Sequence, residues 1–127
     1  MKVLSRTILL RSGWQAVNIG DIAHTPGALA LIREYIPEVR VILWATRGLG
    51  HCAHELLQRT YPDVDVVDSQ SPAALADAFE QADLFIHGSG SNFPGRAQAA
   101  QWQEATGKPF GLLGVTVERP EEFHDLL

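Results

Sequence analysis

The sequence contains very little cysteine. Cys52 is the only one among 127 residues, so the chain can form neither an intramolecular disulfide nor a cysteine-based zinc site by itself. Basic residues are also scarce, because 10 Lys and Arg stand against 15 Asp and Glu and give a formal net charge of −5. This acidic balance argues against a nucleic-acid-binding protein and against a protein that binds an anionic membrane surface.

Long apolar runs are missing as well. None approaches the roughly 18 residues that a membrane-spanning helix needs. Arg6 and Arg11 interrupt the N-terminal apolar stretch before it reaches the length of a signal peptide. We therefore expect a cytoplasmic protein without a membrane span. The length, with 46% hydrophobic and 20% charged residues, is typical of one globular domain.

Short apolar runs alternate with helical patterns along the chain. Five runs predict strands at residues 7–10, 39–44, 64–67, 84–87 and 110–115. They are mostly continuous rather than alternating, as in strands covered on both faces. Helices are expected to begin at Thr25-Pro26 and Ser71-Pro72, where a hydroxyl precedes a proline, and to cover residues 50–60 and 96–106. This alternation predicts an α/β fold, a Rossmann-like doubly wound parallel sheet of five strands.

The segment after the first strand, residues 12–24, is predicted to be a loop longer than the usual connection of about 2–6 residues. Ligands of open α/β sheets bind beyond the carboxyl ends of the strands, so its polar and glycine residues are candidates. Glycine lets the backbone approach a ligand closely. Asn18 and Asp21 either contact ligand hydroxyls or brace the loop through their own backbone, and the sequence favours neither interpretation.

A second loop is predicted after the fourth strand, in residues 87–95. Its small residues would expose successive N–H groups before a helix N-terminus, which suits a phosphate or a carboxylate. A tight turn capped by Ser91 or Asn92 is the alternative. His87 stands at the strand end, where it is either an acid or base or an anchor for the loop. The candidate binding residues of the two loops are Asn18, Gly20, Gly88, Ser89, Gly90, Ser91 and Asn92.

The two glycine-bearing loops favour one strand order. In the order 3-2-1-4-5 the first and fourth strands are neighbours, and both loops border the crevice where the order reverses. In the order 2-1-3-4-5 the crevice would instead be bordered by residues 68–70, which contain no glycine. We therefore predict the order 3-2-1-4-5. His51 and His54 lack a third ligand, so no metal site and no cofactor are expected.

Residues 13–21 (GWQAVNIGD) resemble the N-terminal signature of the polysaccharide pyruvyl transferase family, a glycine-containing loop that closes on Asn-x-Gly-Asp. Residues 87–91 (HGSGS) are similar to the second glycine-rich loop of that family, although many members have three consecutive glycines where this chain has Ser89 in the middle. Residues 111–116 are similar to the fifth strand and the turn after it. The resemblance covers nearly the whole chain.

The resemblance implies a transferase of polysaccharide biosynthesis that moves pyruvate from phosphoenolpyruvate onto a sugar hydroxyl as a ketal. Its partners would be phosphoenolpyruvate and a sugar or polysaccharide acceptor. Since members are similar to two-domain glycosyltransferases, residues 1–127 are expected to be the N-terminal Rossmann-like domain, the acceptor-side half, of such an enzyme. The C-terminal domain would be absent, and with it the basic residues that bind the donor, so this fragment is expected to be inactive alone.

Ketal formation needs an acid, a base and cationic groups. Asp21 is the candidate catalytic carboxylate, but no cationic cluster is evident in the sequence. A non-catalytic nucleotide- or sugar-binding Rossmann-like module is therefore the alternative. A nicotinamide enzyme is disfavoured, since no Gly-x-Gly-x-x-Gly follows the first strand. An exposed apolar patch is expected at Phe123, Leu126 and Leu127.

Overall fold

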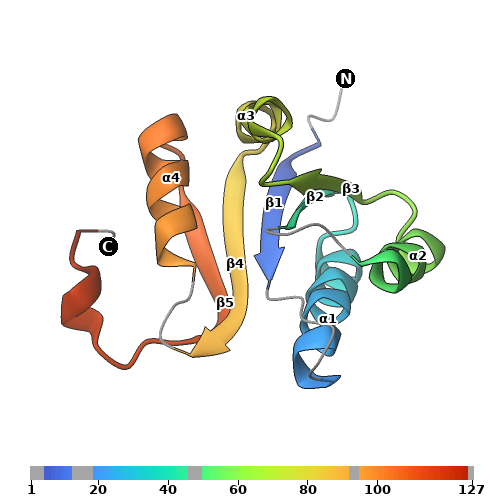
Figure 1. Ribbon diagram of the computed structural model, residues 1–127, viewed down its shortest axis with the longest axis horizontal. Coiled ribbons are helices and arrows are strands. Elements are labelled where there is room, and N and C mark those ends of the chain that lie inside the picture. The colour runs from blue at the N-terminus through green and yellow to red at the C-terminus, as the bar shows by residue number, and fades with distance from the viewer. Residues whose placement is uncertain (1–4, 13–18, 46–49, 92–94, 126–127) are drawn as a thin grey trace.

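The computed structural model describes residues 5–12, 19–45, 50–91 and 95–125 (Figure 1). Its centre is a sheet of five parallel strands in the order β3-β2-β1-β4-β5, so both the α/β class and the predicted strand order are confirmed. The strands are β1 (Thr7–Ser12), β2 (Arg40–Ala45), β3 (Asp65–Asp68), β4 (Leu84–Ser91) and β5 (Phe110–Thr116). The helices are α1 (Ile19–Tyr35), α2 (His51–Thr60), α3 (Pro72–Gln81) and α4 (Arg96–Thr106), followed by the 3-10 helix η1 (Pro120–Phe123).

Apolar side chains cover both faces of the sheet at β1, β2 and β4, whereas Leu112 and Leu113 of the edge strand β5 are 37% and 40% exposed. Along β1, Ile8 and Leu10 point to the face covered by α1 and α2, whereas Leu9 points to the face covered by α3 and α4. Figure 1 shows α1 and α2 together on one side of the sheet and α4 on the other. Because successive side chains of a strand alternate between the two faces, the residues that end β1 are also divided between them.

Aromatic rings dominate the core between the sheet, α3 and α4. Phe79 meets Trp44 and Trp102 edge to face, with ring centroids 5.3 and 5.2 Å apart, a geometry that aromatic pairs prefer. Phe85 of β4 and Trp102 of α4 have no exposed surface. The indole Nε1 of Trp102 donates to the carbonyl oxygen of Lys108 at 3.0 Å, so the buried donor is satisfied. This packing fixes α4 against β4.

The predicted start of the first helix at Thr25-Pro26 is wrong. Helix α1 begins at Ile19, and Pro26 lies inside it, although proline cannot donate the hydrogen bond of a helix interior. The fully buried Thr25 hydroxyl does not cap a helix start but shares a hydrogen bond with Ser12 Oγ at the end of β1. This tertiary contact accounts for Thr25 better than capping does. The predicted loop of residues 12–24 is therefore helical from residue 19 onward.

The predicted loop after the fourth strand is also partly wrong. Residues Gly88–Ser91 continue β4, where Gly88 pairs with Leu113 and Gly90 with Val115 of β5. Their backbone is part of a ladder and does not form the predicted loop of successive free N–H groups. Gly90 at φ 130° and Gly114 at φ 66° adopt conformations that favour glycine, so the end of this ladder is irregular.

The remaining element boundaries agree closely with the sequence. Helix α3 begins at Pro72 after Ser71, and α4 ends at Thr106 before Gly107, which has the left-handed conformation (φ 62°) of a helix C-cap. The apolar patch predicted near the C-terminus cannot be placed, because Leu126, Leu127 and the side chain of Phe123 lie outside what the structure describes.

Candidate functional site

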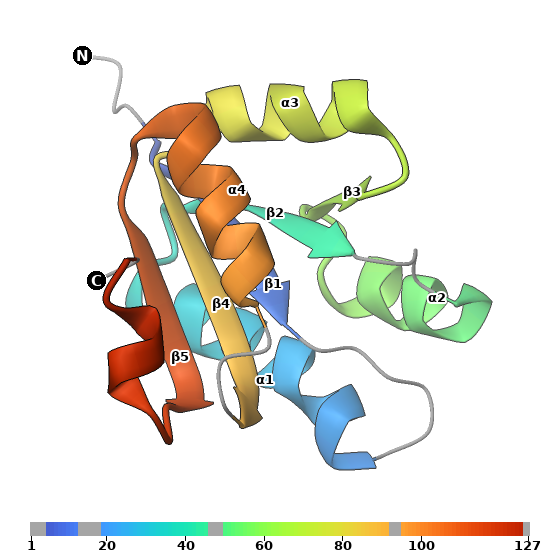
Figure 2. The same cartoon turned by 60° about the vertical axis from the view of Figure 1, so that its left-hand side comes forward.

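The carboxyl ends of β1 and β4 lie side by side. Figure 2 shows β1 and β4 as neighbouring strands that run in the same direction. In their register, Arg11 is opposite His87 and Ser12 is opposite Gly88. The strand order reverses between β1 and β4, and ligands of open α/β sheets bind at this position. The ends of the two strands that the candidate segments were expected to follow are therefore adjacent at this position.

A guanidinium and an imidazole meet on the α4 side of this edge. Arg11 Nη1 lies 2.5 Å from His87 Nε2. A guanidinium can only donate, so Nε2 of His87 must be the acceptor in this hydrogen bond. Burial and, to a smaller extent, the charge of Arg11 lower the pKa of His87 from 6.5 to about 4. His87 is consequently neutral at pH 7, while Arg11, whose pKa is also lowered by burial, supplies positive charge.

The first turn of α4 packs directly on the His87 ring. A Cβ atom added to Gly95, the N-cap residue of α4, would lie 1.8 Å from Cδ2 and 2.2 Å from Nε2 of His87. Gly95 has an ordinary φ of −92°, so this position requires glycine because of space and not because of backbone conformation. The close approach brings the N-terminus of α4 to the Arg11–His87 pair.

The opposite side of the same edge is tied to α1. Ser12 and the buried Thr25 share the hydrogen bond that joins the end of β1 to this helix. A Cβ atom at Gly88 would lie 3.3 Å from Cβ of Ser12, which is tighter than ordinary contact. Close packing of β1 against β4 thus explains Gly88 without a ligand, although it leaves room for a ligand role as well.

The other sequence-predicted site residues are placed by their backbone. Gly20 and Asp21 are the second and third residues of α1, and Ser89, Gly90 and Ser91 are in the last half of β4. The side chain of Asp21 lies outside what the structure describes, so its predicted catalytic role stays a prediction. Asn18 and Asn92 lie outside the described residues.

Sequence reasoning missed Arg11. In the sequence it is one of two arginines that interrupt an apolar stretch, whereas in the structure it extends β1 and pairs with a residue 76 positions away. Extending the predicted first strand by two residues would have placed Arg11 opposite His87 in the predicted strand order. That was the available signal.

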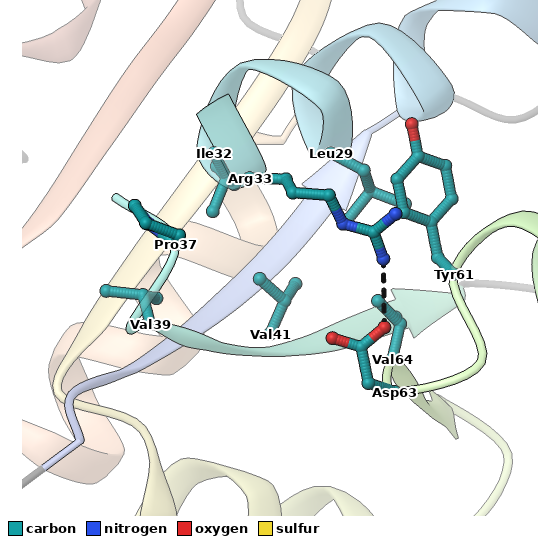
Figure 3. A pocket seen from close by; sticks show the side chains of 9 residues that line it. All are labelled: Leu29, Ile32, Arg33, Pro37, Val39, Val41, Tyr61, Asp63 and Val64. Atoms are coloured by element: carbon teal, nitrogen blue, oxygen red, sulfur yellow. Dashed lines mark hydrogen bonds and ion pairs between the residues drawn. The ribbon is translucent and has the colours of Figure 1, made fainter. Parts of the chain in front are cut away.

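Two hollows of the surface lie at the amino edge of the sheet, away from this site. The first is lined by α1 and the starts of β2 and β3, and its volume of about 40 Å³ admits only water (Figure 3). Arg33 crosses it, 4.5 Å from the centroid of the Tyr61 ring, and pairs with Asp63 at 3.0 Å. The second, a wider groove of about 390 Å³, includes Lys108, which donates to three carbonyl oxygens at the end of α3. Both arrangements stabilise helix ends and suggest no ligand.

Among the described residues, no group of three or more His, Cys, Asp and Glu side chains could hold a metal ion. His51 has instead an ion-pair partner in Glu55, at 3.5 Å on α2. Within the same residues, no helix has both the length and the apolar character needed to cross a membrane.

Comparison with known proteins adds no relative. No protein-family model matches the chain, and neither does any curated protein. The functional interpretation consequently depends on the quoted motifs and on the geometry at the carboxyl ends of β1 and β4.

Proposed function

We propose that the chain is the acceptor-side half of a pyruvyl transferase that forms a ketal from phosphoenolpyruvate and two hydroxyls of a sugar. The observation that carries the proposal is the adjacency of the ends of β1 and β4. The family resemblance depends on the segment that follows β1 and on the end of β4, which are about seventy residues apart in the sequence.

The reaction balances without an oxidant or a reductant. Two sugar oxygens bond to C2 of the enolpyruvyl group, and the bond between C2 and the phosphate oxygen breaks. The two hydroxyl protons are accounted for, because one ends on the methylene carbon, which becomes a methyl group, and the other leaves with inorganic phosphate. The enzyme therefore has to accept a proton from a hydroxyl and deliver one to carbon.

Asp21 is the group we assign to the hydroxyl proton. It is in the first turn of α1, which follows β1, and a carboxylate is a suitable general base. Gly90, which has no side chain, lets a sugar approach the backbone at the end of β4. His87 does not fit the task of the acid, because it is neutral at pH 7 and its Nε2 accepts a hydrogen bond from Arg11. The proton donor to carbon would have to come from elsewhere in the enzyme.

The experiment is a transfer assay on the polypeptide encoded by the whole gene, with phosphoenolpyruvate as donor and a panel of sugars as acceptors. Release of inorganic phosphate and the appearance of a ketal methyl signal by NMR are measured together. We expect Asp21→Asn to lower the transfer rate by about a hundredfold or more while the melting temperature stays nearly unchanged. Asp77→Asn, which alters an exposed carboxylate on α3, is the matched control and should leave transfer unchanged.

Each other outcome has a defined meaning. Full activity of Asp21→Asn would remove Asp21 from the mechanism, and unfolding of the variant would assign it to stabilising the start of α1. Sugar binding without any release of phosphate, across the whole panel, would contradict the transferase and support a non-catalytic binding module.

A further inference from the structure

We propose that Arg11 is the oxyanion-binding residue of this half, taking a phosphate or carboxylate group at the carboxyl edge of β1, and that His87 is the residue that positions it. The proposal deepens the proposed function, because it assigns to the acceptor-side half a contact with the anionic donor. It depends on the proposed function for that assignment only, since oxyanion binding is measurable without transfer.

Arg11 lies at a position in the fold that suits ligand binding. It follows Ile8, Leu9 and Leu10, which are at most 4% exposed, so β1 runs through the core and delivers Arg11 at the ligand-binding edge. Arg11 is partly buried, unlike an arginine whose side chain extends into solvent. A guanidinium with several donors in one plane is well suited to phosphate and carboxylate oxygens.

The partner of Arg11, His87, holds the guanidinium in place. His87 has no exposed surface, and its ring is fixed between Phe85 of its own strand and the backbone of Gly95. The hydrogen bond of 2.5 Å from Arg11 to this immobile ring restricts the guanidinium to one region. A neutral imidazole orients the guanidinium without cancelling its charge. Preorganisation of this kind reduces the entropy lost when a ligand binds.

The contact between Gly95 and His87 also brings the N-terminus of α4 close to the Arg11–His87 pair. Its N-cap residue is a glycine and therefore provides no side-chain cap. The N–H groups of a first helical turn and the positive end of the helix dipole attract anions. The dipole and the Arg11 guanidinium therefore favour the same ligand charge, and the neutral state of His87 avoids a second cation between them.

The test titrates the 127-residue chain with inorganic phosphate, pyruvate and phosphoenolpyruvate at constant ionic strength and pH 7. Chemical-shift changes of the backbone amides of Gly88 and Gly95 and of the Arg11 Nε–H report binding. We expect saturable shifts with dissociation constants in the millimolar range. If phosphate and phosphoenolpyruvate bind but pyruvate does not, Arg11 contacts a phosphate group. If pyruvate and phosphoenolpyruvate bind but phosphate does not, Arg11 contacts a carboxylate group.

Variants separate the roles of the two residues. Arg11→Gln should weaken oxyanion binding by about ten- to a hundredfold, the range of a charge-assisted hydrogen bond. Arg11→Lys keeps the charge but not the planar donor group, so it should weaken binding less than Arg11→Gln does. His87→Gln can keep an acceptor close to the position of Nε2 and should retain binding within about threefold. His87→Leu removes the acceptor and should lose about tenfold. Arg33→Gln, at the opposite edge of the sheet, is the control for net charge.

The proposal fails if phosphate and phosphoenolpyruvate shift none of these resonances, or if Arg33→Gln weakens binding as much as Arg11→Gln does. If His87→Leu does not fold, the comparison of Arg11→Gln with Arg11→Lys still decides the role of Arg11, and His87→Gln decides that of His87. If the enzyme transfers pyruvate and Arg11→Gln changes neither transfer nor oxyanion binding, this inference is wrong and the proposed function stands. If the whole polypeptide binds oxyanions through Arg11 but transfers no pyruvate, the proposed function is wrong and this inference stands.

Discussion

Replacing Gly95 by alanine tests the contact on which the geometry of the site depends. The added Cβ would lie 1.8 Å from His87 Cδ2, whereas ordinary contacts begin at 3.4 Å, so the ring or the start of α4 must move by about 3.4 − 1.8 = 1.6 Å. His87 cannot yield easily, because it is fully buried and packs edge to face against Phe85. Overpacking of this kind costs about 1–3 kcal/mol, and the size of the overlap places Gly95→Ala near about 3 kcal/mol. For a chain of this length we expect the melting temperature to fall by about 10 °C.

The control for this prediction is Gly50→Ala. Gly50 is also an uncapped N-cap residue, of α2, but a Cβ atom there would meet nothing within 4 Å. The general effect of alanine at an N-cap, about 1 kcal/mol or less relative to glycine, is therefore measured separately. Urea unfolding of Gly95→Ala, His87→Ala and the double variant gives the coupling energy, which should be about 2 kcal/mol because removing the ring relieves the overlap. A coupling near zero, or equal losses for Gly95→Ala and Gly50→Ala, would refute the close contact.

Three further outcomes are expected. His87 has a pKa of about 4 in the folded chain, against 6.5 when unfolded, so the free energy of unfolding should fall by at most about 3 kcal/mol as the pH is lowered from 6.5 to 4. Urea unfolding of His87→Gln across that range should lack the part of the decrease that His87 causes. Lys108→Met removes donors to three carbonyl oxygens at the end of α3, so calorimetry should show a loss of about 1–2 kcal/mol. Gly107→Ala places a side chain at φ 62°, where it meets no neighbouring atom, and should cost about 1 kcal/mol of backbone strain in the same measurement.

The strands were predictable because their signal is local. Most of the five contain an apolar run of three or more residues, and burial on both faces of a parallel sheet favours such runs. The strand order was predictable for a different reason. Glycine-bearing segments follow the first and fourth strands, and ligands collect where the strand order reverses, so these two strands had to be neighbours.

The errors occur where a distant residue outweighs a local preference. Thr25-Pro26 has the local pattern of a helix start, but the Thr25 hydroxyl bonds to Ser12 and α1 extends in front of it. Residues Gly88–Ser91 have the composition of a loop, but β5 provides a partner that keeps them extended. Local propensity is a weak guide when tertiary contacts of this kind compete with it.

The Arg11–His87 pair also limits what the proposed acceptor-side half can do by itself. Phosphoenolpyruvate carries one carboxylate charge and about −1.5 to −2 on its phosphate, whereas this pair contributes a single positive charge because His87 stays neutral. Protonating His87 would add a charge, but the same burial and the same neighbouring guanidinium that fix the pair make that state unfavourable. A well-oriented single cation can recognise and orient an anion. Stabilising the charge that develops as phosphate leaves requires more donors than this pair provides, so we expect transfer to need cationic groups beyond Arg11 and His87.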